Sequence, residues 1–250
     1  MARKILRPAK KQPLLIRNEA LLQQKREAVV EAAFELFLKR GFHSTTTRDI
    51  ARRAGISAGA PFTYFKDKEE ILFHIVSKEQ DLATEQLITT LSRQIAEATY
   101  YDTDPEEVFK TVFTTWLHAV DVLRRYILLA YQETKSLNTE TQRALMARER
   151  RLQALIGEAI RYGAERGRFS RDNIALKDHN IMVLGHAWAI RHWAFAGEME
   201  SIEEYIAFLQ PLVLAMLETK TTKEITKKKR SRTPVLEKSV TAVQEEVPTK

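Results

Sequence analysis

Residues 45–65 hold the side chains whose types and spacing could do the most specific chemistry in this chain, which is to present a short helix to a nucleic acid. Thr46 can accept a hydrogen bond from the backbone N–H of Asp49 and so cap a helix over about 47–54. Gly55 follows, and a glycine can adopt the left-handed conformation that ends a helix and turns the chain. The spacing predicts a helix, a tight turn and a second helix.

The second helix of this motif is expected over about 58–65, capped by Ser57, with Ile56 filling the angle between the two helices. The first N–H groups of a helix have no partner within it, so they can bind phosphate and base edges in a DNA groove. Pro61 would be its fourth residue and would remove one backbone hydrogen bond, at an early position that limits the damage. The alternative is that the two helices form no more than a structural corner.

We divide the expected DNA contacts by their role. Phosphate contacts are expected from Thr46, Thr47, Arg48, Tyr64 and Lys68. Base edges are expected to meet Ser57, Ala58, Ala60 and Thr63. None of these four is Arg, Asn or Gln, so the second helix cannot offer the bidentate contacts that read guanine or adenine. We therefore expect specificity from methyl contacts to thymine, backbone positioning and DNA shape, with a contact of Arg48 to guanine as an alternative.

Enzymatic and metal chemistry are poorly supported by the sequence. The chain has six histidines and no cysteine, and the pair His179 and His186, seven residues apart, is not part of an H-x-x-x-H pattern. The G-x-S-x-G, P-loop and G-x-G-x-x-G patterns are also absent. We expect a protein that is not an enzyme, with no metal site and no cofactor.

The region from about 25 to 75 resembles the TetR/AcrR family of transcriptional regulators. The matching residues are Ala32-Ala33, Leu36-Phe37, Gly41-Phe42, Thr45 to Thr47, Ile50-Ala51, Ala54-Gly55-Ile56-Ser57, Gly59, Phe62, Tyr64-Phe65, Lys68-Glu69 and Ile71-Leu72. The resemblance implies an all-α homodimer with one DNA-binding domain per subunit and a divergent C-terminal domain that binds an inducer or corepressor. Phe62 stands where the family often has Tyr, which puts one hydroxyl contact to phosphate in doubt.

The periodicity of apolar residues is helical along the whole chain, and eight glycines and seven prolines fall mostly at the edges of helical patterns. This predicts an all-α fold: an N-terminal helix-turn-helix domain of three helices and a larger helical domain for ligand binding and dimerisation. Besides the two short helices of the motif, the expected helices are 19–40, 67–98, 105–123, 124–135, 139–166, 173–197 and 202–218. Their expected N-caps include Asp104, Asn138, Asp172 and Ser201.

Large apolar residues crowd the last two expected helices, 173–197 and 202–218. The resemblance implies that they pair with their mates in a second subunit as a four-helix interface. The alternative is that the same residues form the core of a monomer. A two-fold protein matches a palindromic DNA site, which favours the homodimer.

The resemblance also implies an effector site inside the C-terminal helices. Candidate lining residues are Phe113, Trp116, Leu117, Tyr126, Leu129, Trp188 and His192. Aromatic residues at helical spacing are equally compatible with a plain core. Segments 132–137 and 163–169 look similar to regulators that sense acyl-CoA or other lipid-derived thioesters, and a multidrug or aromatic ligand is the main alternative.

Basic residues are concentrated at the two ends of the chain. The formal net charge is +7, but residues 1–18 carry six basic and no acidic side chains, and residues 219–250 carry nine basic and four acidic ones. Residues 19–218 therefore hold a net charge of −4, so the overall charge says little about the folded body. We expect both ends to be disordered, and the alternative is arms that attract phosphate without sequence preference.

The chain is thus expected to divide into a basic disordered arm (1–18), a helix-turn-helix domain (19–75), an effector-binding and dimerisation domain (76–218) and a disordered basic tail (219–250). No apolar run is long enough to span a membrane and no signal peptide is recognisable, so we expect a cytoplasmic protein. Its expected partners are a double-stranded DNA operator, a small-molecule effector and a second copy of itself, with no membrane.

These features predict a sequence-specific DNA-binding transcriptional regulator. More specifically, they favour a repressor that is released from a palindromic operator by a small-molecule effector. The alternatives are a regulator of a multidrug or aromatic-compound response, and an architectural DNA-binding protein that senses no ligand.

Overall fold

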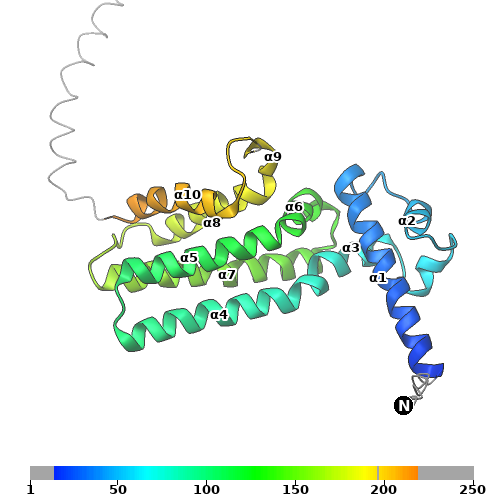
Figure 1. The fold of residues 1–250 in the computed structure, drawn as a ribbon, viewed down its shortest axis with the longest axis horizontal. Coiled ribbons are helices and arrows are strands. Elements are labelled where there is room, and N and C mark those ends of the chain that lie inside the picture. Colours follow the sequence, from blue (N-terminus) through cyan, green and yellow to red (C-terminus); the bar gives the residue numbers. More distant parts are fainter. Residues whose placement is uncertain (1–13, 196, 219–250) are drawn as a thin grey trace, which may run out of the picture.

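A computed structural model of the protein describes residues 14–195 and 197–218. Its elements are α1 (Leu14–Arg40), α2 (Thr47–Arg53), the 3₁₀ helix η1 (Ala60–Thr63), α3 (Lys68–Phe73), the π-helical segment η2 (His74–Lys78), α4 (Glu79–Tyr101), α5 (Pro105–Val122), α6 (Arg124–Glu133), the 3₁₀ helix η3 (Thr134–Ser136), α7 (Thr139–Glu165), α8 (Ile174–Ile190), α9 (His192–Phe195) and α10 (Ile202–Leu217). Over the described residues no strand forms, and the all-α prediction is confirmed. Figure 1 shows a long helical bundle with α1 crossing one of its ends.

The smaller domain, at that end of the bundle, packs α1, α2, η1 and α3 around one apolar core. Phe34 and Phe37 lie one helical turn apart on α1 and are at most 2% exposed, so this side of the helix faces inward. Ile50 of α2 and Ile71 of α3 close the core from the other side. Gly41, with a φ of +79°, ends α1 in the left-handed conformation that favours glycine.

The larger domain is a bundle in which α4, α5, α7, α8 and α10 share a continuous apolar core. Gly185 allows α8 to lie directly against α5, because a Cβ at this position would stand 2.0 Å from the Cη2 of Trp116 and 3.1 Å from Leu117. No described helix is long and apolar enough to cross a lipid bilayer.

Two elements join the domains. The long helix expected over 67–98 is interrupted at His74–Lys78 by η2, a π-helical turn in which the backbone hydrogen bonds span one residue more than in an α-helix. The second connector is α6, which belongs to the larger domain in sequence. Nevertheless, its Leu129 and the following Leu137 are buried in the core of the smaller domain.

Most predicted helix starts are confirmed, because their side chains bond the free N–H groups of the first turn. Asp104, Asn138 and Ser201 each accept from backbone N–H groups two or three residues later. The prediction of Asp172 as a cap is wrong: Asn173 holds that position with a φ of +54°, a left-handed conformation that asparagine tolerates, and makes no side-chain capping bond.

Two other boundaries also differ from expectation. The first helix begins at Leu14, so residues 14–18 are helical although they were expected in the disordered arm. The helix expected over 173–197 ends at Ile190, because Arg191 leaves the helical conformation with φ −121° and ψ 20°. The remaining parts of the expected arm and tail, 1–13 and 219–250, lie outside the described residues.

Replacing Gly185 with Ala should destabilise the larger domain, since the new methyl group would overlap the indole of Trp116. We expect a loss of about 1–3 kcal/mol in the free energy of unfolding, the usual cost of overpacking a core. Urea unfolding followed by circular dichroism measures it. Gly59→Ala is the matched control, because its Cβ meets no atom within 4 Å. Equal midpoints for the two variants would show that α8 and α5 are not packed this closely.

Candidate nucleic-acid interface and ligand cavity

The first helix of the motif begins as its sequence predicts. The hydroxyl of Thr46 accepts from the N–H of Asp49 at 3.1 Å, and the carboxylate of Asp49 accepts from the N–H of Thr46 at 3.2 Å. These hydrogen bonds from Thr46 hold the pKa of Asp49 below its ordinary value. Gly55 has a φ of +69° and turns the chain after α2, as expected.

The second helix differs from the prediction. Residues 58–65 do not form an α-helix capped by Ser57; instead a short 3₁₀ helix, η1, runs over Ala60–Thr63 after a turn, and Gly59 at its N-cap position makes no side-chain bond. The cause is Pro61, which has no N–H to donate to Ser57 as an α-helix would require. The N–H of Ala60 bonds the carbonyl of Ser57 at 3.0 Å instead, which closes a tighter turn.

This recognition segment, residues 57–65, nevertheless keeps an outward face. Pro61 and Phe65 are buried against the small domain and anchor the segment. Of the expected base-contacting residues, Ser57, Ala58 and Thr63 are exposed and Ala60 is partly exposed. The expected exposure of these side chains is thus confirmed, although sequence reasoning assigned them the wrong kind of helix.

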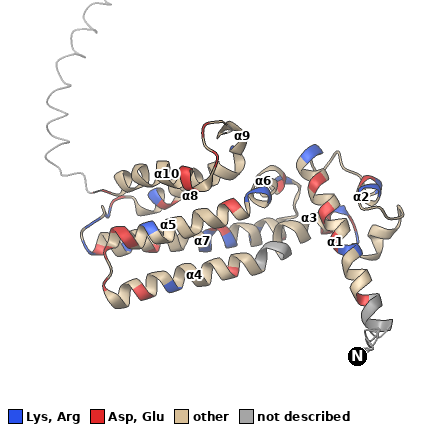
Figure 2. Ribbon diagram, viewed as in Figure 1, with Lys and Arg blue, Asp and Glu red and all other residues tan. Residues whose placement is uncertain are grey.

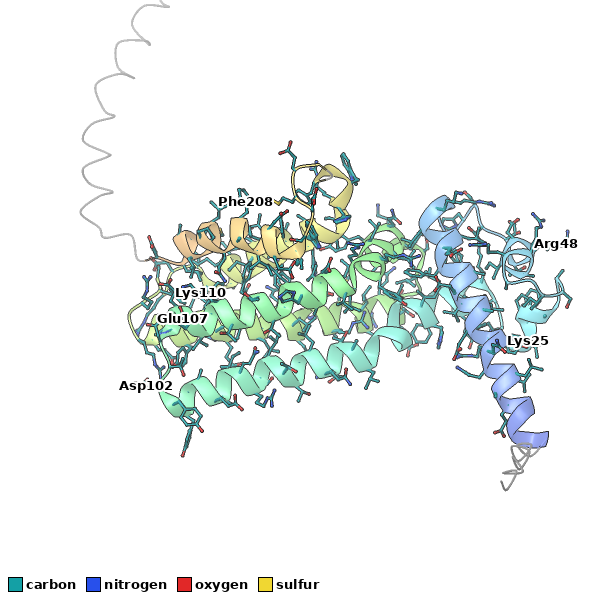
Figure 3. The ribbon with its side chains drawn as sticks, viewed as in Figure 1. Lys25, Arg48, Asp102, Glu107, Lys110 and Phe208 are labelled. Carbon is teal, nitrogen blue, oxygen red and sulfur yellow. The ribbon has the colours of Figure 1, made fainter. Side chains whose placement is uncertain are left out.

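The expected phosphate-contacting residues are all at least partly exposed. Thr46 and Arg48 are exposed at the start of α2, and Figure 3 shows Arg48 projecting away from the body of the protein. Thr47 and Tyr64 are partly exposed. Figure 2 shows that basic residues are also present on α2, where Arg52 and Arg53 accompany Arg48.

Lys68 makes structural hydrogen bonds within the smaller domain, in addition to any contact with DNA. Its Nζ donates to the carbonyls of Phe42 at 2.9 Å and Thr45 at 3.0 Å, and lies 4.1 Å from the centroid of the Phe42 ring. Two of the three donors of the ammonium group therefore hold the turn between α1 and α2. Sequence reasoning missed this structural role because Lys68 is 26 residues from Phe42 and 23 from Thr45 in the chain.

A cluster that the sequence did not reveal attaches the recognition segment to η2. The Nη2 of Arg26 on α1 lies 3.2 Å from the Nδ1 of His74, and its guanidinium stands 4.9 Å from the centre of the Phe65 ring. The rings of Phe65 and His74 are 5.6 Å apart. His74, the first residue of η2, therefore packs against Phe65, the buried anchor at the end of the recognition segment.

The larger domain contains a cavity of about 370 Å³, a volume typical of small-molecule sites. Its described lining residues come from α4 to α8 and from η2. They are Val76, Thr84, Leu87, Trp116, Ala119, Val120, Leu123, Tyr126, Ile127, Ala130, Tyr131, Thr134, Leu145, Met146, Arg148, Glu149, Arg150, Leu152 and His186. The cavity is thus largely apolar, with polar groups from α6, α7 and α8.

Two of the seven predicted effector-site residues, Trp116 and Tyr126, line this cavity. The other five do not, and they are Phe113, Leu117, Leu129, Trp188 and His192. The first four are at most 1% exposed in the two cores, and His192 packs against Trp188 with ring centres 4.6 Å apart. Helical spacing selects buried residues, but whether a buried side chain meets another side chain or an open space depends on how neighbouring helices pack.

The polar residues of the cavity wall were missed by sequence reasoning. The hydroxyl of Tyr131 lies 3.0 Å from the Nδ1 of His186, which is 5% exposed. Burial lowers the pKa of His186 to about 4, so the ring is neutral near pH 7. Burial raises the pKa of Glu149 against the opposing effect of Arg148, and burial together with Glu149 raises the pKa of Tyr131.

One helix connects the cavity to the small domain. On α6, Tyr126 lines the cavity and also stacks on Phe34 of α1, with ring centroids 4.5 Å apart and planes 17° from parallel. At the end of the same helix the buried carboxylate of Glu133 accepts from the N–H of Phe42 at 2.9 Å. A ligand that shifts α6 would therefore shift α1 and the turn that follows it.

A second connection runs through η2. Arg148 of α7 lines the cavity and donates to the carbonyls of Val76 at 2.9 Å and Ser77 at 3.4 Å. Val76 itself lines the cavity and is buried in the core of the smaller domain. Val76 and Arg148 therefore belong to the cavity wall and also take part in the packing of η2, the segment that precedes α4.

Comparison with known proteins matches both parts of the chain. Residues 29–75 match the model for bacterial regulatory proteins of the tetR family, and residues 102–217 match the model for the tetracyclin repressor-like C-terminal domain. The first match covers the helix-turn-helix, and the second covers α5 to α8, which form most of the cavity wall.

Individual relatives agree with this result. The chain is 30% identical to the HTH-type transcriptional regulator HbdR of Aromatoleum sp. (strain CIB) over 77% of this chain and 80% of that protein. Its fold is similar to that of the TetR family regulator PfmR of Thermus thermophilus, with a TM-score of 0.61 and 25% identity over 75% of this chain and 97% of that one. It is also similar to AibR in complex with isovaleryl coenzyme A and operator DNA, with a TM-score of 0.61 and 19% identity over 78% and 98% of the two chains. The protein therefore belongs to the TetR family of DNA-binding transcriptional regulators.

Proposed function

We propose that this protein is a repressor that binds a palindromic operator as a homodimer and is released when a small molecule fills the cavity of the larger domain. The observation that carries the proposal is the double role of α6, which lines the cavity with one side and is buried in the DNA-binding domain with the other. The cavity is thereby linked by direct contacts of α6 to α1 and to the turn that follows it in the DNA-binding domain. An architectural DNA-binding protein that senses no ligand would not require a helix shared between a cavity and the DNA-binding domain.

Binding of DNA would use the outward face of the recognition segment. Thr63, Ser57 and Ala58 would meet base edges by methyl and hydroxyl contacts, and Arg48 with the exposed start of α2 would meet phosphate. The third donor of Lys68 would add a phosphate contact, and Tyr64 would contribute its hydroxyl.

A second copy of the chain would cover the outer faces of α8 and α10. Phe208, Leu212 and Met216 recur every four residues on α10 and are 55%, 49% and 36% exposed, and Leu176 and Val183 of α8 are also exposed. Figure 3 shows Phe208 on the outer side of α10. Burying such a stripe against its own two-fold copy would stabilise a dimer and set the spacing of two recognition segments.

The effector would be an acyl thioester or another lipid-like molecule. The largely apolar wall of the cavity supports a hydrocarbon ligand, and AibR is a structural relative whose complex contains isovaleryl coenzyme A. The second candidate is an aromatic or multidrug effector, because Trp116 and Tyr126 in the wall could stack on an aromatic ring.

Changing Arg48 to Ala should weaken binding to operator and random DNA by similar factors, because a phosphate contact carries no sequence information. The slope of log affinity against log salt should become shallower by about one unit. Fluorescence anisotropy with both DNAs across a salt series measures this. Arg93→Ala on α4, exposed and distant from the motif, should leave the slope unchanged. A loss confined to the operator would instead assign Arg48 to base readout.

Changing Leu212 to Glu should convert the dimer into monomers, because a charge would be buried at the centre of the proposed interface. Light scattering after size-exclusion chromatography gives the mass directly. Leu82→Glu, at a 70% exposed position on α4, should keep the mass of the parent. A parent protein that is monomeric at micromolar concentration would overturn the assignment of this face.

Changing Ala130 to Phe should fill the cavity from α6 and block the effector while leaving DNA binding intact. Isovaleryl and octanoyl coenzyme A, together with any molecule that native mass spectrometry finds bound after purification, are tested for release of the operator. We expect the variant to need at least about tenfold more effector for half release, equivalent to about 1.4 kcal/mol. Release at unchanged concentration would place the effector elsewhere, and no release of the parent by any of these compounds would contradict the sensing function.

A further inference from the structure

The turn between α1 and α2, residues 41–46, leads directly into the start of α2, where Thr46 and Arg48 are exposed. Within this turn Phe42 is buried, with 3% of its surface exposed. Its backbone N–H and carbonyl therefore need partners inside the protein, because a buried polar group without a hydrogen bond is costly.

Two side chains of opposite charge supply these partners. The N–H of Phe42 donates to Oε1 of Glu133 at 2.9 Å, and the carbonyl of Phe42 accepts from Nζ of Lys68, also at 2.9 Å. A formal charge on one partner makes each of these bonds stronger than a bond between neutral groups. We call the arrangement of Glu133, Phe42 and Lys68 the Phe42 clamp.

The two charged members of the clamp come from different parts of the chain. Lys68 begins α3 in the smaller domain, whereas Glu133 is the last residue of α6 and is 7% exposed. The hydroxyl of Ser136 donates to Oε2 of Glu133 at 2.9 Å, since a carboxylate can only accept. The oxygen of Ser136 can then accept from Nε2 of His43 at 3.2 Å. Glu133 and Ser136 thus contact two consecutive residues of the turn.

We propose that Glu133 is a positioning residue for DNA binding: by bonding the N–H of Phe42, it holds the turn 41–46 in the conformation that presents Thr46 and Arg48 to phosphate. The proposal rests on the phosphate contacts proposed above for the start of α2. Without Glu133 the N–H of Phe42 would lack a partner, which favours conformations in which the turn moves towards water. DNA would then have to restore the position of α2, and affinity would fall by that cost.

Replacing Glu133 by Ala and by Gln tests the clamp. The DNA is a labelled duplex that the parent protein selects from a random-sequence pool, and affinity is measured by fluorescence anisotropy with the full chain and no effector. Glu133→Ala should bind at least about fivefold more weakly than the parent. Glu133→Gln should stay within about twofold of the parent, because its amide oxygen can still accept from the N–H of Phe42.

The sign of the effect separates the hydrogen bond from simple electrostatics. Loss of an acidic side chain by itself would strengthen binding to a polyanion, and both variants lose the same charge. Unchanged or stronger binding by Glu133→Ala would therefore overturn the proposal. So would equal losses in the two variants, because the retained hydrogen bond would then have no effect.

Tyr162→Phe is the control for a general loss of stability. The hydroxyl of Tyr162 donates to the carbonyls of Ala98 at 3.0 Å and Thr103 at 2.7 Å, beside the loop between α4 and α5 at the end of the bundle away from α1 (Figure 1). This variant also loses hydrogen bonds within the larger domain, and it should keep the affinity of the parent well below its unfolding midpoint. A loss equal to that of Glu133→Ala would show that stability and not position sets the affinity.

A double-mutant cycle with Arg48→Ala locates the effect. If Glu133 acts by positioning the start of α2, the combined fold-loss of both changes should be smaller than the product of the single losses, because a displaced Arg48 contributes less. A combined loss equal to the product would overturn positioning at α2. If Arg48→Ala alone has no effect, the proposed phosphate contact fails, whereas the comparison of Ala with Gln at position 133 still decides whether the clamp sets the affinity.

Discussion

Burial of α6 between two apolar cores is the interaction on which the arrangement of this molecule depends. Leu129 lies in the core of the DNA-binding domain, and Ile127 packs against the core of the larger domain, although both belong to the same short helix. Separation of the domains would expose both faces of α6 to water, at a cost that grows with the apolar area uncovered. The recognition segment consequently has a defined position relative to the cavity.

The contacts around this helix also explain how a small change can be transmitted. The Phe34 ring stacks on the Tyr126 ring, and the guanidinium of Arg125 stands 4.7 Å from the Phe34 centroid. Glu133 is a buried carboxylate whose removal would leave the N–H of Phe42 without its partner. Packed side chains and buried hydrogen bonds of this kind resist gradual deformation, so a displacement of α6 would strain its contacts with α1.

The recognition segment shows a different balance of local forces. Ser57, Gly59 and Pro61 are poor residues for a regular α-helix, and the chain there forms a turn and one 3₁₀ helix. Two buried residues, Phe65 and Pro61, fix its position. Arg26 and His74 pack against the ring of Phe65. The exposed face can therefore be rigid without a long helix to support it.

The sequence by itself determined what local chemistry decides. It specified the helical fold, the capping of α2 by Thr46 and Asp49, the left-handed turn at Gly55 and the outward placement of Ser57 and Thr63, because each depends on neighbours within a few residues. Only the tertiary structure decided that Lys68 would bond the carbonyls of Phe42 and Thr45, that Trp116 would line a cavity while Phe113 fills a core, and that Tyr131 would meet His186. These outcomes depend on how distant helices cross, as at Gly185, and a helical repeat in one segment does not encode the space left beside it.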